Sequence, residues 1–294
     1  MSTRIGFLKG HGTENDFVIV PDPDDTLDLG PAAVAALCDR RAGIGGDGLL
    51  RVVRSAAHPE ASGMAAEAEW FMDYRNADGS IAEMCGNGVR VFARYVQRAG
   101  HVQAGDLAVA TRGGVKRVHL AKGEGGADGD ITVSMGRAVL PEERATVTVE
   151  GRSWPAYNVN MGNPHAVAFV DDLAHAGDLF RPPPLSPEGV YPEGVNVEFV
   201  VDRGERHVAM RVHERGSGET RSCGTGACAV AVATARRDGV DPARTGTPVA
   251  YTVDLPGGRL VITEHPDGTV EMTGPAVIVA EGEIDPDWFE TVLR

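Results

Sequence analysis

Short apolar runs alternate with glycine, proline and polar turns along most of the chain, a pattern typical of many short strands. In the first half, strands are expected near residues 5–8, 16–20, 49–53, 69–75, 107–111 and 115–120. In the second half, they are expected near residues 131–134, 145–149, 156–160, 165–170, 196–202 and 207–214, and further strand-like segments follow.

Helical patterns interrupt the strands in three places. Residues 31–41 are expected to form a helix, because the proline at its start suits a first turn. Residues 227–235 are apolar nearly all round, which indicates a helix buried in a core. Another helix is expected after residue 88, where one face is formed at i, i+3, i+4 and i+7 by Val89, Phe92, Ala93 and Val96.

Two of these helices follow a cysteine and a glycine-rich turn. Residues 84–88 read MCGNG and residues 222–226 read SCGTG, so that Cys85 and Cys223 stand at equivalent places. A helix N-terminus offers unpaired N–H groups and about half a positive charge. That environment stabilises a thiolate and also binds a carboxylate. The repeat therefore indicates two acid/base thiols that act on one anionic substrate.

The neighbourhood of the two cysteines is also repeated. Asn76 lies nine residues before Cys85, and Glu214 lies nine residues before Cys223. Asn15 and Asn163 each stand at the head of a predicted strand. This duplication predicts two similar domains, and the glycine-rich stretch at residues 123–129 is the expected boundary.

Two thiols on opposite faces of a carbon suit the inversion of an amino acid, because one removes the α-proton and the other returns it. The carboxylate becomes enolate-like during this step and needs hydrogen-bond donors. The expected donors are the backbone amides of Gly86, Asn87, Gly224 and Thr225. Such a reaction requires no cofactor.

Other candidate sites are expected to have structural and not functional roles. Residues 43–48 match G-x-G-x-x-G, but they follow a helix and precede a strand, so a tight turn is expected and not a dinucleotide site. Cys38 and Cys228 are expected in the core. The spacing of the cysteines does not fit a zinc site or a redox pair.

Composition excludes further classes. Forty-two acidic and 28 basic residues give a net charge of −14, which argues against nucleic acid or an anionic membrane surface as a partner. No apolar stretch approaches the ~20 residues that span a bilayer, and residues 1–7 lack the core of a signal peptide. Four cysteines are too few for a disulfide scaffold, so a cytoplasmic location is expected.

Several motifs over nearly the whole chain resemble those of diaminopimelate epimerases. They are NADGS at residues 76–80, MCGNG at 84–88, MGNPH at 161–165, NV at 196–197, ER at 214–215 and CGTG at 223–226. The resemblance implies an α/β fold of the α+β type, with two pseudo-symmetric domains, each a curled, mostly antiparallel sheet around a central helix. The implied domains are residues 1–128 and 129–275, with residues 276–294 packing back onto the first.

The resemblance also implies an isomerase that interconverts LL- and meso-2,6-diaminopimelate for lysine and peptidoglycan synthesis. It implies a two-base mechanism with one thiolate and one thiol, without cofactor or metal. Cys85 and Cys223 match the catalytic bases, and His165 and Glu214 match groups that tune the thiols. Substrate-binding positions are matched by Asn15, Asn76, Gly86, Asn87, Asn163, Asn196, Glu214, Arg215, Gly224 and Thr225.

Two positions depart from the family pattern. Gly48 stands where many members have a glutamine that contacts the substrate. Ala280 stands where many have a tyrosine at a dimer contact, although a homodimer is still expected.

Three alternatives stay open at this point. One is a racemase of the proline or histidine type on the same fold. The others are an amino-acid binding protein without catalysis and a thiol-disulfide oxidoreductase. Solvent deuterium exchange at the α-carbon separates an epimerase from a binding protein, and insulin reduction reveals an oxidoreductase.

Overall fold

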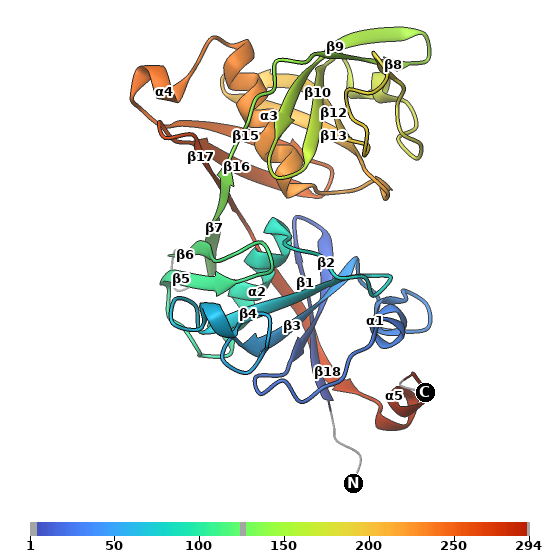
Figure 1. Ribbon diagram of the computed structural model, residues 1–294, viewed down its shortest axis with the longest axis vertical. Coiled ribbons are helices and arrows are strands. Elements are labelled where there is room, and N and C mark those ends of the chain that lie inside the picture. Colours follow the sequence, from blue (N-terminus) through green and yellow to red (C-terminus); the bar gives the residue numbers. More distant parts are fainter. Residues whose placement is uncertain (1–4, 124–127, 293–294) are drawn as a thin grey trace. The chain divides into compact units, whose positions relative to one another are not determined.

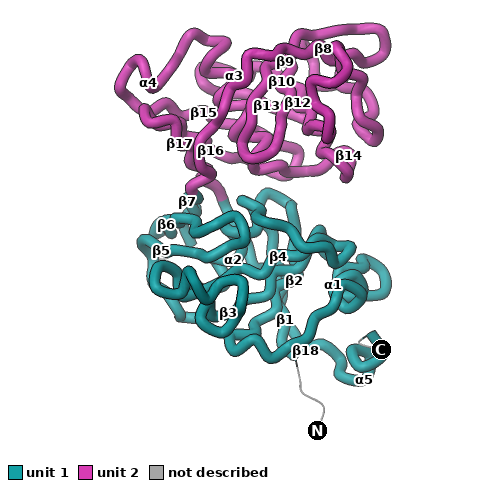
Figure 2. Tube along the Cα trace, in the orientation of Figure 1, with its two compact units in different colours: residues 1–133, 275–294 teal, residues 134–274 magenta. Residues whose placement is uncertain are grey.

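The computed structural model describes residues 5–123 and 128–292 and divides the chain into two compact units (Figures 1 and 2). Unit 1 comprises residues 1–133 and 275–294, and unit 2 comprises residues 134–274. The glycine-rich segment at 123–129, where the sequence pattern places the boundary, lies partly outside the described residues.

Unit 1 is a curled sheet that surrounds the helix α2 (Gly86–Arg98). Its strands are β1 (Ile5–Gly12), β2 (Asn15–Pro21), β3 (Gly48–Arg54), β4 (Trp70–Asn76), β5 (Gly105–Ala110), β6 (Lys116–Lys122), β7 (Asp128–Arg137) and β18 (Val277–Ile284). They pair in the order β18-β1-β2-β3-β4-β5-β6-β7. The pairs β2–β3 and β4–β5 are parallel, and the others are antiparallel.

Unit 2 repeats this arrangement around the helix α3 (Gly224–Arg237). Its main strands are β8 (Ala145–Val149), β9 (Arg152–Asn160), β10 (Pro164–Phe169), β12 (Asn196–Gly204), β13 (His207–Glu214), β15 (Val249–Leu255), β16 (Gly258–Glu264) and β17 (Thr269–Gly274). They pair in that sequence, with β10–β12 and β13–β15 parallel. The two units therefore share one topology, as the duplicated cysteine turns predict.

Short elements complete the units. Outside the sheet of unit 1 lie α1 (Pro31–Cys38), α5 (Pro286–Val292) and the 3₁₀ turn η1 (Ser62–Met64). Unit 2 adds α4 (Pro242–Thr245), η3 (Leu173–Ala176) and the two-residue strands β11 (Leu185–Ser186) and β14 (Gly218–Glu219). Among the described residues, no helix is long and apolar enough to span a bilayer.

The core of unit 1 joins the two ends of the chain. Strand β1 pairs with β18 from Ile5 opposite Ile284 onwards. Ile284 and Phe289 pack in one buried cluster with Val20 and Leu37. Residues 275–292 thus complete the sheet and the core that residues 5–54 begin.

Three details differ from the sequence pattern. The helix predicted at residues 31–41 ends at Cys38, because the Asp39 carboxylate accepts from the amides of Arg41 and Ala42 and holds a turn. The strand predicted near residues 5–8 extends to Gly12, and a two-residue hairpin of Thr13 and Glu14, both with positive φ, joins it to β2. The glycines after each cysteine lie inside the helices and not before them.

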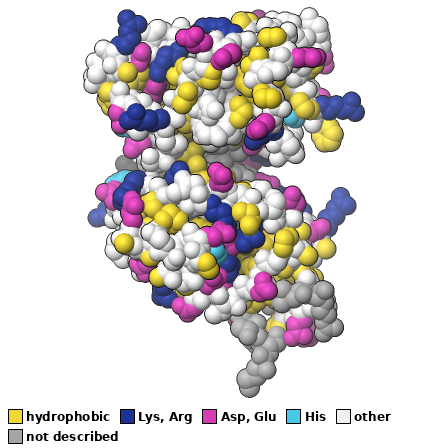
Figure 3. Space-filling model, in the orientation of Figure 1, with side chains coloured by type: hydrophobic (Ala, Val, Ile, Leu, Met, Phe, Trp, Pro, Cys, Tyr) yellow, Lys and Arg dark blue, Asp and Glu magenta, His cyan; other side chains and the backbone are white. Residues whose placement is uncertain are grey.

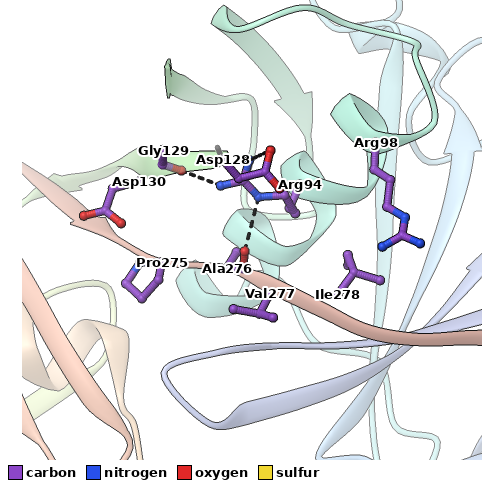
Figure 4. A pocket seen from close by; sticks show the side chains of 9 residues that line it. All are labelled: Arg94, Arg98, Asp128, Gly129, Asp130, Pro275, Ala276, Val277 and Ile278. Carbon is purple, nitrogen blue, oxygen red and sulfur yellow. Dashed lines mark hydrogen bonds and ion pairs between the residues drawn. The ribbon is translucent and has the colours of Figure 1, made fainter. Parts of the chain in front are cut away.

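A polar pocket of unit 1 shows how α2 is anchored (Figure 4). Arg94 is buried, and its guanidinium donates to the backbone oxygens of Gly129 and Ala276 and pairs with Asp128. One helix side chain therefore holds both segments through which the chain leaves unit 1 and returns to it. No residue predicted for the functional site lines this pocket.

The surface carries no large area of a single charge on the face that Figure 3 shows, where hydrophobic, basic and acidic side chains are interspersed over both units. The net charge of −14 is therefore spread out on this face.

Candidate active site

Cys85 is the N-cap residue of α2, with extended backbone angles of φ −137° and ψ 118°. Its Sγ accepts from the amide of Gly88 at 3.4 Å, as a serine or aspartate oxygen does at other N-caps. The sulfur also lies 3.5 Å from Oδ1 of Asn15, which accepts from Nδ2 of Asn87 at 3.2 Å. Three of the predicted site residues are thus brought together in unit 1.

Cys223 is the N-cap of α3 in the same way, and its Sγ accepts from the amide of Gly226 at 3.4 Å. This thiol is more enclosed, with 4% of its surface exposed. Burial raises its pKa well above the usual value, and the carboxylates of Glu214 and Glu198 raise it further. The surroundings of Cys223 therefore favour the thiol over the thiolate.

Glu214 is the acceptor beside that thiol. Its carboxylate accepts hydrogen bonds from Cys223 and from the hydroxyl of Thr220. Burial raises the pKa of Glu214, and these hydrogen bonds offset part of the increase. A proton that leaves Cys223 thus has a carboxylate within reach.

His165 is fully buried between two acceptors. Its Nδ1 lies 2.6 Å from Oε1 of Glu198, which is also fully buried, and its Nε2 lies 3.1 Å from Oδ1 of Asn163. Nδ2 of Asn163 donates to Oγ1 of Thr225 at 3.3 Å, and that oxygen lies 3.6 Å from Sγ of Cys223. The predicted residues Asn163, His165 and Thr225 therefore form a series of hydrogen bonds that leads from Glu198 to Cys223.

Asn196 and Arg215 form a second group in unit 2. Oδ1 of Asn196 accepts from the backbone amide of Arg215 at 2.8 Å, and its Nδ2 donates to Pro164. The Arg215 guanidinium donates to the backbone oxygen of Glu193, and the residue is exposed. A cation on a loop that Asn196 supports is available to a ligand.

Asn76 is held by hydrogen bonds to its own neighbours. Its Oδ1 accepts from the Tyr74 hydroxyl at 3.0 Å, and its Nδ2 donates to Ser80. It pairs across the sheet with Gly48, the position where many family members have glutamine.

The two half-sites match residue by residue. Phe17 on β2 pairs with Gly48 on β3, and His165 on β10 pairs with Asn196 on β12, each 148 residues later. By the same spacing, Leu50 corresponds to Glu198. Three polar or ionisable residues near Cys223 thus replace uncharged residues near Cys85, because His165, Glu198 and Glu214 correspond to Phe17, Leu50 and Asn76.

Two glycines confirm this equivalence. A Cβ on Gly88 would lie 3.3 Å from Cδ2 of Leu50, and a Cβ on Gly226 would lie 2.9 Å from Oε1 of Glu198. The latter would also lie 3.2 Å from Sγ of Cys223. The absent side chain at Gly226 therefore lets the Glu198 carboxylate approach the cysteine turn.

Glu198 is the site residue that sequence reasoning missed. It lies in the apolar run of β12, two residues after Asn196, and strand alternation puts both on the same face. A lone carboxylate in an otherwise apolar buried strand was the available signal. Its partner His165 could be identified only from the parallel pairing of β10 with β12.

Comparison with known proteins identifies the family of the chain. A family model described as diaminopimelate epimerase matches residues 7–141 and 157–279. The diaminopimelate epimerase of Streptomyces coelicolor is 80% identical over 293 residues, covering 100% of both chains. Those of Mycolicibacterium smegmatis and Rhodococcus jostii are 47% and 45% identical, covering 97% and 96% of this chain and 99% and 98% of theirs.

Solved structures share the fold at low sequence identity. A Bacillus anthracis phenazine biosynthesis protein of the PhzF family superposes with a TM-score of 0.71 at 15% identity, covering 96% of this chain and 99% of that chain. A hydroxyproline epimerase from Agrobacterium vitis has a TM-score of 0.66 at 14% identity, covering 96% and 91%. The predicted fold class is confirmed. The chain belongs to the diaminopimelate epimerase family, a family of isomerases.

Proposed function

We propose that this enzyme interconverts LL- and meso-2,6-diaminopimelate, with Cys85 and Cys223 as its two bases. The observation that carries the proposal is the pair of matched cysteine N-caps, each at the start of the central helix of its unit. One sulfur removes the α-proton as a thiolate, and the other returns a proton as a thiol. The reverse reaction exchanges the two roles.

The protonation of Cys223 supports this division of labour. Burial and the Glu214 and Glu198 carboxylates keep it a thiol, ready to donate. Cys85 has uncharged neighbours in Asn15 and Asn87. Different surroundings allow one of two identical side chains to be a thiol while the other is a thiolate.

The amides of the two helix N-termini are the proposed donors to the α-carboxylate. Those of Gly86 and Asn87 start α2, and those of Gly224 and Thr225 start α3. Positive charge at a helix start stabilises the negative charge that develops as the α-proton leaves. Removal of one such donor typically costs roughly 3–4 kcal/mol.

The second amino-acid group of diaminopimelate does not react and needs its own contacts. Asn76, Asn196 and Arg215 are the proposed contacts, with Arg215 binding the distal carboxylate. The exposed guanidinium and the loop that Asn196 holds support this assignment. Proline and histidine lack a second amino-acid head, and the 80% identity to a diaminopimelate epimerase also disfavours such racemases.

We also propose that the enzyme acts in the cytoplasm as a homodimer, without nucleic acid or membrane. The last strand supports a dimer, because β18 carries exposed apolar residues, among them Val277 and Val279. Ala280 faces Lys9 across the β1–β18 pair. Sedimentation at several protein concentrations tests this, and a monomer at micromolar concentration would contradict it.

The decisive experiment is incubation of reduced enzyme with LL-diaminopimelate in D₂O. Nuclear magnetic resonance should show the meso isomer with deuterium at the inverted α-carbon. Binding without exchange would indicate a protein without catalysis. Turnover of proline or histidine in place of diaminopimelate would indicate a racemase, and insulin reduction would indicate an oxidoreductase.

A further inference from the structure

A chain of hydrogen bonds links Glu198 to Cys223 within unit 2. Glu198 lies 2.6 Å from Nδ1 of His165, whose Nε2 lies 3.1 Å from Oδ1 of Asn163. The nitrogen of Asn163 donates to Thr225, whose Oγ1 lies 3.6 Å from the sulfur. A fully buried carboxylate is thus connected to the thiol through three side chains.

Unit 1 shows that the framework does not require this pair. Phe17 and Leu50 occupy the positions that correspond to His165 and Glu198, and both are fully buried. Apolar residues of similar volume often stabilise a protein as much as a buried ion pair does, or more. A role in the chemistry of Cys223 explains the pair better than a role in folding.

The two acceptors beside His165 determine how many protons the ring carries. A carboxylate only accepts, so Nδ1 donates to Glu198. Asn163 turns its oxygen to Nε2 because its nitrogen donates to Thr225, so Nε2 donates as well. A ring that donates from both nitrogens is an imidazolium.

The burial of Glu198 requires that positive charge. Among the residues that the structure describes, Oε2 of Glu198 has no hydrogen-bond partner. An uncompensated carboxylate in a fully buried position is strongly unfavourable. The imidazolium of His165 neutralises it through Oε1.

A neutral His165 would reverse the chain of hydrogen bonds. Its Nε2 would accept, Asn163 would turn its nitrogen to the ring, and its oxygen would accept the Thr225 hydroxyl proton. With the imidazolium, Thr225 accepts from Asn163, and its own O–H can donate to Sγ of Cys223. A donor to the sulfur favours the thiolate that must form when Cys223 acts as the base.

We propose that Glu198 is a positioning residue for Cys223, because it keeps His165 doubly protonated and so directs the hydrogen bonds of Asn163 and Thr225 towards the sulfur. This inference rests on the proposed role of Cys223 as acid and base. Two further ionisable groups face the cluster, Glu214 on β13 and Tyr191 before β12. The Thr225 and Gly226 donors offset the carboxylates of Glu198 and Glu214, which oppose the thiolate.

The protonation of His165 is tested without turnover. Histidine-labelled ¹⁵N spectra of the full chain, assigned with His165→Phe, report the protons on each ring nitrogen. The wild type is expected to show both nitrogens protonated at the pH of the assay, and Glu198→Gln is expected to lose one proton. A neutral ring in the wild type would overturn the inference, whatever the roles of the two cysteines.

A double-mutant cycle tests whether Glu198 acts on Cys223 through the hydrogen bond of Thr225. Glu198→Gln is expected to lower kcat about tenfold in the wild type but less than about twofold in a Thr225→Val background. Equal losses in the two backgrounds would overturn the coupling. Glu264→Gln is the control, since it removes another buried carboxylate of unit 2, one that pairs with Arg236, and should leave kcat unchanged.

Replacement of His165 and Glu198 by the residues found at the equivalent positions of unit 1 separates an effect on folding from an effect on catalysis. The double variant His165→Phe with Glu198→Leu is expected to keep a Tm at least equal to that of the wild type and to lose most of its kcat. A variant that fails to fold would assign the pair to stability. A variant with full turnover would show that the pair of His165 and Glu198 has no role in the reaction.

Discussion

Leu50 and Glu198 occupy the same place in two copies of one framework, each beside the third residue after a cysteine N-cap. The backbone register around them is conserved between the units, whereas the side chains differ in charge. The position beside the turn of Cys85 is therefore apolar, and the equivalent position beside the turn of Cys223 is ionisable. A duplicated fold has become two unequal half-sites.

Replacement of either catalytic cysteine should abolish inversion. Cys85→Ala and Cys223→Ala each remove one of two required groups, and general acid–base groups contribute about 10²–10⁴-fold to rate. The measurement is the conversion of LL- to meso-diaminopimelate. Cys38→Ala and Cys228→Ala are the controls, because both residues are buried in helices, and they should retain turnover. Near-normal inversion by either Cys85→Ala or Cys223→Ala would exclude the two-base scheme.

Arg215→Met should discriminate between substrates. Loss of a charged hydrogen bond to the distal carboxylate costs roughly 1.5–3 kcal/mol, or about 10- to 150-fold in kcat/KM. An analogue without that carboxylate should be affected much less. Arg203→Met, at another exposed arginine of unit 2, is the control and should leave kcat/KM unchanged for both substrates. Equal losses for both substrates would place Arg215 in the scaffold.

Alanine should be tolerated better at Gly88 than at Gly226. At Gly88 the nearest atoms are Cδ2 of Leu50 at 3.3 Å and Cβ of Cys85 at 3.4 Å. At Gly226 the new Cβ would meet the Glu198 carboxylate at 2.9 Å and push it from His165. Both changes improve helix propensity by up to ~1 kcal/mol, so Tm should hold while kcat falls more in Gly226→Ala. A larger fall of kcat in Gly88→Ala would contradict the assigned position of Glu198.

Asp73 should make the stability of the protein sensitive to acid. Burial by itself raises its pKa, but Arg75 and Arg112 outweigh burial and lower the pKa from 3.8 to about 2. The unfolded chain binds this proton more tightly, so the stabilisation is present above about pH 4 and is lost as the pH falls towards 2. A shift of this size corresponds to about 2 kcal/mol.

Denaturant unfolding at several pH values measures this effect. Asp73→Asn should lower the free energy of unfolding at neutral pH and flatten its decrease between about pH 4 and pH 2. An unchanged slope in the variant would show that other carboxylates dominate. Asp24→Asn is a suitable control, because Asp24 forms an exposed pair with Arg54.

Much of the framework could be predicted from the sequence because its signals are local. Strand alternation, the proline at the start of α1 and the apolar helix α3 all depend on residues close together in the chain. The cysteine turns also revealed the duplication. The end of α1 at Cys38 was less accessible, since it depends on how one side chain, Asp39, accepts from two amides.

The ionisable cluster around Cys223 could be predicted only in part. Glu214 and His165 lie within recognisable motifs, but Glu198 does not. Its role depends on the register of β10 against β12, which joins residues 31 positions apart, and on the space above Gly226. Such contacts are decided by the folded chain and not by neighbouring residues.

During synthesis, β1 leaves the ribosome long before its partner β18 is made. Unit 2 is one continuous segment, residues 134–274, whereas unit 1 is complete only with residues 275–294. Until then, β1 exposes an unpaired edge, and the cluster of Ile5, Ile284 and Phe289 cannot close. The half-site of Cys223 therefore belongs to a contiguous unit, whereas that of Cys85 belongs to a unit whose sheet and core need segments from two distant parts of the chain.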